Sequence, residues 1–379
     1  MSVREKRLEP EMQKRLAIFL PSLAGGGAEK SMLKLAAGIA QRGYPVDLIL
    51  ARAEGPYKTH LAGLPELVRV VDLKAGRVLL SLPALARYLW RIQPDALLST
   101  LDYANLVALW ARCLARAPRK LVVNEQNTIS LTSQHSAQLR QRIVPRLVKH
   151  FYPWADHIIG NSRGVADDLA QITGLPHSEI QLIYNPVVTP ELAEKVKASP
   201  NHPWLEIGQP PMVLAVGRLT AQKDFPTLIR AFAQVRRSQP VRLLILGEGP
   251  DRSSLEALIK QLGIEEDVCL PGFVENPYAY MSRASVFVLS SRWEGLPTVL
   301  IEALYCGVPV ISTDCPSGPR EILADGKYGA LVPLQNSTAL AEMIKMALAG
   351  QIPRPTRDSW RSYELETIVD QYIHILIED

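Results

Sequence analysis

The chain has 379 residues, with 42 Lys and Arg against 38 Asp and Glu and a formal net charge of +4. Hydrophobic residues make up 47% and charged residues 21%, which excludes a largely disordered chain and predicts two or three domains. Residues 1–190 carry 24 basic and 15 acidic side chains, whereas residues 191–379 carry 18 and 23. This asymmetry indicates that the first half faces an anionic surface, a phosphate or a nucleic acid, unless the charge is merely solvated.

The spacing of the four cysteines favours a protein of a reducing compartment. They are Cys113, Cys269, Cys306 and Cys315, and no two form a Cys-x-x-Cys pair, so neither a disulfide framework nor a zinc site is expected. Residues 1–15 are charged throughout and the apolar run 16–23 is too short for a secretory signal. No window approaches the ~20 apolar residues that span a bilayer. We therefore expect a soluble, cytoplasmic protein that can still lie against a membrane.

Short β-branched runs alternate with longer helical patterns through the first half of the chain. Strands are expected at 16–21, 46–51, 68–73, 96–99, 120–124 and 157–161. Helices are expected at 28–42, 82–91, 105–115 and 136–151. Strand–helix units repeated in this way predict parallel βαβ units and an open sheet.

The alternation breaks at 183–190 and resumes after Pro211. The second series predicts strands at 212–216, 242–246, 268–271, 286–290 and 308–313, and helices at 226–237, 255–262 and 297–306. A second break at 351–357 precedes an amphipathic helix at 363–377. The pattern predicts two Rossmann-like domains, residues 1–187 and 188–357, with segment 358–379 returning to the first.

Three glycines, Gly25 to Gly27, follow the first expected strand and open a helix. Glycine lets the backbone approach a ligand closely, and a helix N-terminus favours an anion. A dinucleotide fingerprint would need glycine where Lys30 stands, so an NAD site is weakly supported although Asp47 lies 20 residues beyond Gly27. The glycines either form a plain turn or contact an anion or substrate.

Two cations, Arg218 and Lys223, follow the first strand of the second domain. A forked guanidinium and a point-charge ammonium at the carboxyl edge of a sheet can share a diphosphate. The alternative is a pair of solvated surface cations.

Two carboxylates, Glu294 and Glu302, stand eight residues apart around the start of the expected helix 297–306. Pro297 suits the first turn of that helix, and the nearby amides of Leu296 and Thr298 point outward at its positive end. A carboxylate such as Glu302, in the middle of an apolar helix, is costly unless it accepts hydrogen bonds. The arrangement suits a nucleotide diphosphate that carries polyols at both ends; a structural salt bridge is the alternative.

The ordered set of these motifs resembles the retaining glycosyltransferases of family four, of the bacterial surface-polysaccharide type and the GT-B fold. The residues that carry the resemblance are Glu294 and Glu302, Arg218 and Lys223, Gly247-Glu248-Gly249-Pro250, Pro271-Gly272-Phe273-Val274 and the run 313–321. The resemblance covers essentially the whole chain. It implies an α/β fold of two Rossmann-like domains, with the N-terminal one binding the acceptor, the C-terminal one binding the nucleotide sugar, and a C-terminal helix crossing back.

The resemblance also implies roles for single residues. Arg218 and Lys223 bind the donor diphosphate, Glu294 the transferred sugar and Glu302 the ribose. Further donor contacts fall on Gly26, Gly27, Phe273, Val274, Leu296, Pro297 and Thr298. Such enzymes require no bound divalent metal or other cofactor, and this sequence contains no Asp-x-Asp motif. In retaining transfer the departing phosphate is thought to take the acceptor proton, which demands stabilisation of the leaving group.

One departure from the family concerns the end of the strand at 120–124. Many relatives carry a His there, whereas this chain reads Asn124-Glu125-Gln126-Asn127. Glu125 or Asn127 could take over its contact with the sugar or acceptor, or the site could be partly disabled.

Basic residues concentrate in the segment 139–154. Arg140, Arg142, Arg146 and Lys149 accompany an expected apolar face of Leu139, Ile143, Leu147 and Val148, with Phe151, Tyr152 and Trp154 just after. A basic amphipathic helix with interfacial aromatics is typical of a membrane-surface element. An ordinary packing helix with a solvated face is the alternative.

These observations favour a retaining glycosyltransferase that moves a hexose or N-acetylhexosamine from a nucleotide diphosphate sugar, UDP-linked by expectation. Its expected acceptor is a lipid-linked or polysaccharide glycan of the bacterial envelope, with peripheral contact to the inner membrane. A nucleotide-sugar epimerase, a sugar phosphorylase and a non-catalytic nucleotide-sugar-binding partner remain alternatives, and an NAD oxidoreductase is weaker. No nucleic acid is expected, because only bulk charge supports one. The sequence does not indicate the sugar, the base, the linkage or the oligomeric state.

Overall fold

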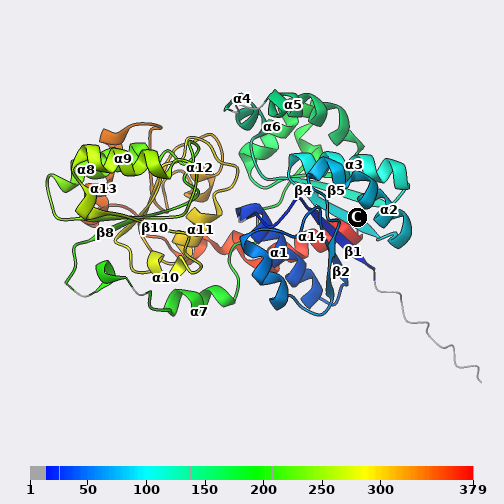
Figure 1. The fold of residues 1–379 in the computed structure, drawn as a ribbon, viewed down its shortest axis with the longest axis horizontal. Helices are drawn as coiled ribbons and strands as arrows, with labels where there is room; N and C mark the ends of the chain where they lie inside the picture. Colours follow the sequence, from blue (N-terminus) through cyan, green and yellow to red (C-terminus); the bar gives the residue numbers. More distant parts are fainter. Residues whose placement is uncertain (1–13, 25, 136–138, 201, 207, 379) are drawn as a thin grey trace, which may run out of the picture. The chain divides into compact units, whose positions relative to one another are not determined.

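A computed structural model describes residues 14–24, 26–135, 139–200, 202–206 and 208–378. Its first sheet has seven strands in the order β3-β2-β1-β4-β5-β6-β7 (Figure 1). They are β1 (Leu16–Leu20), β2 (Val46–Leu50), β3 (Val68–Asp72), β4 (Ala96–Thr100), β5 (Lys120–Glu125), β6 (His157–Gly160) and β7 (Ile180–Leu182). The strands at its centre pair in parallel, and the order reverses between β1 and β4.

The second sheet has six strands in the order β10-β9-β8-β11-β12-β13. They are β8 (Met212–Val216), β9 (Arg242–Leu246), β10 (Val268–Gly272), β11 (Val286–Leu289), β12 (Val310–Thr313) and β13 (Ala330–Val332). All neighbouring strands are parallel, and the order reverses between β8 and β11. Two parallel sheets with this order confirm the predicted pair of Rossmann-like domains.

Helices connect the strands in both halves. Before the second sheet they are α1 (Gly27–Gln41), α2 (Leu82–Ile92), α3 (Asp102–Ala115), α4 (Ile129–His135), α5 (Leu139–Phe151), α6 (Arg163–Thr173) and α7 (Glu191–Lys197). After β8 they are α8 (Phe225–Arg236), α9 (Arg252–Leu262), α10 (Tyr278–Met281), α11 (Thr298–Tyr305), α12 (Pro319–Ile322), α13 (Ser337–Leu348) and α14 (Leu365–Ile373). No helix of the described ranges is long and apolar enough to cross a membrane.

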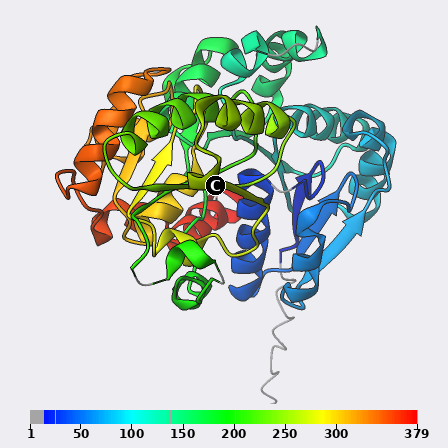
Figure 2. The ribbon, with the colours of Figure 1, turned by 60° about the vertical axis from the view of Figure 1, so that its left-hand side comes forward.

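Successive side chains of the second sheet pack into two hydrophobic cores on its opposite faces, because side chains of a pleated strand alternate between the faces. Val213 and Ala215 of β8 face a core built with α8, α9 and α13. Met212 and Leu214 face the opposite core, built with α10 and α11. Figures 1 and 2 show these two groups of helices on opposite faces of the sheet. Both faces are covered, which explains why these strands are short apolar runs.

Five helices of the described structure were not predicted, namely α4, α6, α10, α12 and α13. The sequence signals the starts of two of them. At the start of α6, the Ser162 side chain accepts a hydrogen bond from the amide of Val165, and Gly174 ends the helix in the left-handed conformation. At the start of α13, the Asn336 side chain accepts from the amide of Ala339. The helix expected at 136–151 is observed as α5, which ends at Phe151 as predicted, and residues 136–138 lie outside the described residues.

The C-terminal helix returns to the first sheet, as expected. The buried Asn124 side chain at the end of β5 donates to the Tyr372 hydroxyl at 2.7 Å. The ammonium groups of Lys120 and Lys14 donate to the carbonyls of Ile375 and Ile377. α14 is shorter than the predicted 363–377, because a π-helical turn, His374–Glu378, follows it.

The chain divides into two compact units. One contains Met1–Asn124, His150–Ile158 and Val369–Asp379, and the other contains Glu125–Lys149 and Ile159–Ile368. The expected boundary at 187–188 lies between the last strand of the first sheet and the first strand of the second. It stays a prediction.

Candidate active site

Two loops meet at the carboxyl end of the second sheet. Residues 217–224 follow β8 and residues 290–297 follow β11, and these strands are paired where the strand order reverses. In open α/β sheets, ligands bind in the crevice at this point of reversal. The topology thus brings together the two sequence runs that carry the strongest candidates.

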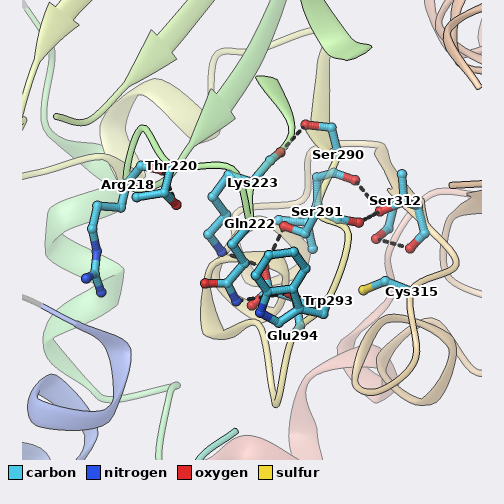
Figure 3. A network of polar contacts seen from close by, with 12 residues as sticks. Arg218, Thr220, Gln222, Lys223, Ser290, Ser291, Trp293, Glu294, Ser312 and Cys315 are labelled. Atoms are coloured by element: carbon cyan, nitrogen blue, oxygen red, sulfur yellow. Dashed lines mark hydrogen bonds and ion pairs between the residues drawn. The ribbon is translucent and has the colours of Figure 1, made fainter. Parts of the chain in front are cut away.

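The two loops are fastened to each other by backbone and side-chain hydrogen bonds (Figure 3). The Ser290 hydroxyl donates to the carbonyl of Lys223 at 2.7 Å. The amide of Arg292 donates to the carbonyl of Gln222 at 2.8 Å, and the Gln222 side chain donates to the carbonyl of Trp293 at 2.9 Å. The loops therefore form one rigid platform.

An ion pair joins the two loops at their centre. The Lys223 ammonium lies 2.6 Å from Oε1 of Glu294, and the side chains are only 16% and 8% exposed. The Ser291 hydroxyl donates to the same oxygen at 2.6 Å. Oε2 of Glu294 accepts no hydrogen bond from any residue within the described ranges, so one oxygen is committed to the protein and the other is available. Neither Ser291 nor the pairing of Lys223 with Glu294 was anticipated from the sequence.

Arg218 is not part of this pair. Its side chain is exposed and makes no hydrogen bond or ion pair with the described part of the chain. Figure 3 shows it at the edge of the network, pointing away from Glu294. The structure therefore places one buried, paired cation and one exposed cation on the same loop.

Glycines allow the loop after β9 to pack directly on the loop after β8. A Cβ at Gly247 would lie 2.0 Å from the carbonyl oxygen of Gly217, and one at Gly249 would lie 2.3 Å from that of Leu219. Gly247 also has a φ of 144°, which side chains rarely adopt. The Gly-Glu-Gly-Pro run thus serves the close approach of two loops.

The helix after this platform begins within one residue of its expected start. α11 runs Thr298–Tyr305, with Pro297 at the N-cap. Amides in the first turn of a helix have no partner within the helix, so those of Thr298 and its neighbours form a positive end. Glu302 is buried, and its Oε1 accepts a hydrogen bond from the Tyr278 hydroxyl at 3.0 Å. The hydrogen bond that this carboxylate was expected to need is thus supplied, at one oxygen, by the protein.

The loop before α11 is also held from behind. The Ser317 hydroxyl donates to the carbonyl of Gly295 at 2.8 Å, and a Cβ at Gly318 would lie 2.4 Å from Cδ of Pro297. Cys315 is buried here, and this burial, with the charge of Glu294, raises the pKa of its thiol far above the ordinary value. Ser317 and Gly318 therefore hold the loop before α11 at Gly295 and Pro297.

The segment Asn124–Asn127 spans the end of β5. Gln126 and Asn127 lie against Gly295, and the next residue, Thr128, contacts Glu294. The Thr128 hydroxyl donates to the carbonyl of Glu294 at 3.4 Å. A Cβ at Gly295 would lie 3.1 Å from Cα of Asn127 and 2.0 Å from the carbonyl oxygen of Gln126. Asn127 is half-buried, and its side chain has no hydrogen-bond partner among the residues placed by the structure.

Glu125 faces a different environment. It is buried, and its Oε1 accepts from the amide of Gln126 at 2.9 Å. Next in the chain, the buried side chain of Gln126 exchanges hydrogen bonds with that of Asn185 and accepts one from that of Asn161. This amide cluster was missed from the sequence, because Asn161 and Asn185 are distant in the chain. Of the two proposed replacements for the missing His, Asn127 lies against the loop of Glu294.

The residues expected near the base lie at the edge of the sheet. Phe273 and Val274 follow β10, the edge strand, after Gly272 with a φ of 92°. Phe273 is 59% exposed and Val274 is partly buried. Their strand lies two places from β8, whose following loop carries Lys223.

Gly26 and Gly27 lie in the other compact unit. Gly26 is the N-cap of α1, where the Glu29 carboxylate folds back over it, and Gly25 is outside the described residues. Asp47, considered for a ribose contact, is buried on β2, where Arg69, Arg15 and Tyr88 donate hydrogen bonds to its carboxylate. It is a structural carboxylate, which removes the support for an NAD site.

The basic segment lies on α5 and the turn that follows. Arg142, Arg146 and Lys149 are exposed, and Val144 and Val148 are buried. The expected apolar face was wrong at Ile143, which is 48% exposed beside these cations. The side chains of Leu139 and Arg140 lie outside the described part.

Comparisons with known proteins match both halves. The model of the family "Glycosyltransferase Family 4" matches residues 25–190, and that of "Glycosyl transferases group 1" matches residues 201–366. A relative from Campylobacter jejuni, an N-acetylgalactosamine-N,N'-diacetylbacillosaminyl-diphospho-undecaprenol 4-alpha-N-acetylgalactosaminyltransferase, is 33% identical over 349 residues, 89% of this chain and 90% of that protein. The chain belongs to glycosyltransferase family four.

Other relatives and solved structures agree with this placement. The lipopolysaccharide core biosynthesis glycosyltransferase LpsE of Rhizobium meliloti is 28% identical over 93% of this chain and 96% of its own. HepE of Anabaena, solved in complex with UDP and glucose, matches with a TM-score of 0.75 at 23% identity, over 97% of this chain and 100% of that one. This family-four glycosyltransferase thus has the GT-B fold, and it is similar to enzymes of bacterial surface-glycan synthesis.

Proposed function

We propose that the chain transfers a hexose or N-acetylhexosamine, with retention of configuration, from a UDP-linked sugar to a lipid-linked or polysaccharide acceptor of the bacterial envelope. The observation that carries the proposal is the buried pair of Lys223 and Glu294 beside the positive end of α11, at the reversal point of the second sheet. The UDP of HepE and the undecaprenyl-linked substrate in the name of the Campylobacter relative support the choice of donor and acceptor.

In the proposed reaction, Lys223 and the first-turn amides of α11 neutralise the diphosphate as it leaves. The bond between the anomeric carbon and the diphosphate oxygen breaks, and a bond to the acceptor oxygen forms on the same face. The acceptor proton passes to the departing phosphate, so no strong protein base is needed. Electrostatic stabilisation of a leaving group by fixed charges is the largest single contribution in many enzymes.

The proposed roles of the remaining residues follow their positions. Glu294 holds the transferred sugar with Oε2, and Glu302 holds the ribose. Arg218, being exposed and without a partner among the described residues, is available to turn toward the diphosphate. Asn127 is the replacement for the missing His that lies against the loop of Glu294. We propose that no bound metal takes part, because the cations named above supply the charge.

The membrane contact belongs to this proposal. Exposed Arg142, Arg146 and Lys149, with exposed Ile143, suit an anionic lipid interface in which a lipid-linked acceptor is embedded.

A donor panel tests the proposal. Saturating donor, at about 100 times its dissociation constant, stabilises a protein by ~2.7 kcal/mol, a shift of roughly 5 °C in melting temperature. We expect a shift with UDP-sugars, and transfer to an undecaprenyl-diphosphate-linked acceptor that Glu302→Ala abolishes. Phosphate-dependent release of sugar without an acceptor would indicate a phosphorylase, and binding without transfer a non-catalytic partner. No shift with UDP-, GDP- or ADP-sugars would refute donor binding.

A further inference from the structure

The segment 77–92, which forms the 3₁₀ helix η2 (Val78–Ser81) and α2, has an unusual outer face. It contains three arginines and no acidic residue. Arg77, Arg87 and Arg91 are all exposed. Leu79, Leu80 and Trp90 lie among them and are 49%, 67% and 62% exposed. We call these six residues the α2 surface.

The apolar members of the α2 surface are not needed for the core. α2 buries Leu85, Tyr88 and Leu89 on its inner side. Arg87, Trp90 and Arg91 recur at helical spacing on the opposite side. A solvent-facing stripe of a helix is ordinarily polar, so an exposed Trp90, three residues after Arg87 and next to Arg91 in the sequence, is a feature to explain.

The same character continues onto the neighbouring helix. α2 and α3 pack side by side (Figure 1), and both run against the direction of the parallel strands they connect, so their C-terminal ends lie at the same edge. At that end of α3, Leu114 is 68% exposed and Arg116 is exposed. The α2 surface is thus part of a wider face that mixes cations with apolar side chains.

The charges of this face are available to a partner. None of Arg77, Arg87, Arg91 and Arg116 makes an ion pair with a residue in the described ranges. An arginine that has no carboxylate partner within the protein retains its full attraction for an external anion. A paired arginine must first give up its carboxylate partner. The occupant of this face must therefore be anionic and must also accept Leu and Trp side chains.

We propose that the α2 surface docks on an anionic lipid bilayer, with Leu79, Leu80 and Trp90 in the headgroup–acyl boundary and the arginines on lipid phosphates. This inference rests on the lipid-linked acceptor proposed above. Protein segments that lie in the membrane interface commonly combine Leu and Trp with Arg. The apolar side chains enter the boundary of the acyl chains while the arginines reach the lipid phosphates just above it. A second copy of the chain is a poor occupant of the α2 surface. A two-fold contact would place the arginines of one copy against those of the other, and the segment 77–92 has no acidic residue to pair with them.

Flotation of the full-length protein with vesicles tests the proposal. Wild type is expected to float with phosphatidylcholine–phosphatidylglycerol vesicles and much less with phosphatidylcholine alone. At about 1 kcal/mol per cation, each arginine is worth roughly fivefold in partitioning, so R77Q/R87Q/R91Q should weaken binding to the anionic vesicles about a hundredfold. L79S/L80S/W90S should also weaken it, and moderate salt should release what remains.

A matched variant removes the same charge elsewhere. R230Q/R237Q/K260Q changes three exposed cations on α8, its C-terminal flank and α9 of the other unit, and should float like wild type. Equal losses in both triple variants would overturn the assignment, because only net charge would then matter. An unaffected α2 variant would do so as well. A wild-type dimer that the α2 variant makes monomeric, or RNA binding that only this variant loses, would name another occupant and refute the bilayer.

The same variants separate this inference from the proposed function. All three should transfer sugar to a short, water-soluble acceptor at the wild-type rate, because the α2 surface lies outside the donor site. Normal transfer with no flotation of wild type would overturn the docking surface, and with it the membrane contact proposed for α5, but not the transfer reaction. Flotation as expected, with no transfer to any acceptor, would instead overturn the proposed function.

Discussion

The pair of Lys223 and Glu294 offers the sharpest test of the site, since neither side chain is well solvated. At 2.6 Å and an effective dielectric constant of about 20, Coulomb's law gives roughly 6 kcal/mol of gross attraction. The loss of hydration offsets a large part of this. What remains visible is the cost of breaking the pair, which for buried pairs is about 3–5 kcal/mol, because the surviving charge stays buried and unpaired.

We therefore expect Glu294→Gln and Lys223→Met each to lower the free energy of unfolding by about 3 kcal/mol, at the lower end because Lys223 is 16% exposed. The double variant K223M/E294Q should lose far less than the sum of the two, since it leaves no orphaned charge. The measurement is urea denaturation followed by circular dichroism, for wild type, both single variants and the double variant.

A surface pair provides the control. Lys197 and Glu194 form an ion pair at 2.8 Å, but both side chains are more than two-thirds exposed. The same four-protein cycle with K197M and E194Q should show no measurable coupling. If the losses at Lys223 and Glu294 simply add, the two charges do not depend on each other, and the reasoning from burial is refuted.

Three further predictions follow from single contacts. Tyr278→Phe removes the hydroxyl that donates to Glu302 but keeps the buried ring, so we expect a several-fold rise in KM for the donor with little change in kcat, measured by steady-state kinetics. Gly247→Ala forces a Cβ to 2.0 Å from a backbone oxygen at a φ of 144°, so it should lower the free energy of unfolding by at least ~2 kcal/mol, measured by urea denaturation. The control is Gly263→Ala, where the Cβ meets open space at a φ of 67° and the loss should be about 1 kcal/mol. Burial raises the pKa of the Cys306 thiol to about 12, so the folded state holds this proton more tightly than the unfolded state. Stability should therefore fall as pH rises from about 9 towards 12, and a thiol reagent at pH 8.5 should label exposed Cys113 well before Cys306; equal rates would contradict the burial.

The fold was largely predictable because it depends on local patterns. Apolar runs of five residues separated by amphipathic stretches identify parallel strands and their helices, and the breaks at 183–190 and 351–357 mark where the pattern stops. The missed α6 carries two local signals that were not used. Ser162 and Gly174 cap its two ends, and Val165, Leu169 and Thr173 recur at helical spacing on its buried side.

The site was predictable in its residues but not in their partners. Lys223 and Glu294 were recognised by motif, yet they lie 71 residues apart, and only the order β8–β11 in the sheet makes their loops neighbours. Tyr278 lies on a four-residue helix with no motif of its own, 24 residues before the Glu302 that it contacts. Contacts of this kind depend on strand order and loop path, which no local pattern encodes.

The shared oxygen of Glu294 has a consequence for the proposed reaction. Lys223 and Ser291 both bond to Oε1, so when an incoming diphosphate draws Lys223 away, Ser291 still holds that oxygen in place. The carboxylate then keeps its orientation, and Oε2 remains directed at a sugar hydroxyl. Before the donor arrives, the pair keeps the ammonium positioned on the platform, so little reorganisation is needed when charge develops on the leaving group. Ser291→Ala should therefore leave donor affinity nearly unchanged but slow transfer about tenfold, measured by single-turnover kinetics, because the carboxylate loses its second anchor only once Lys223 has moved. A loss confined to donor affinity would show that Ser291 acts on the resting pair alone.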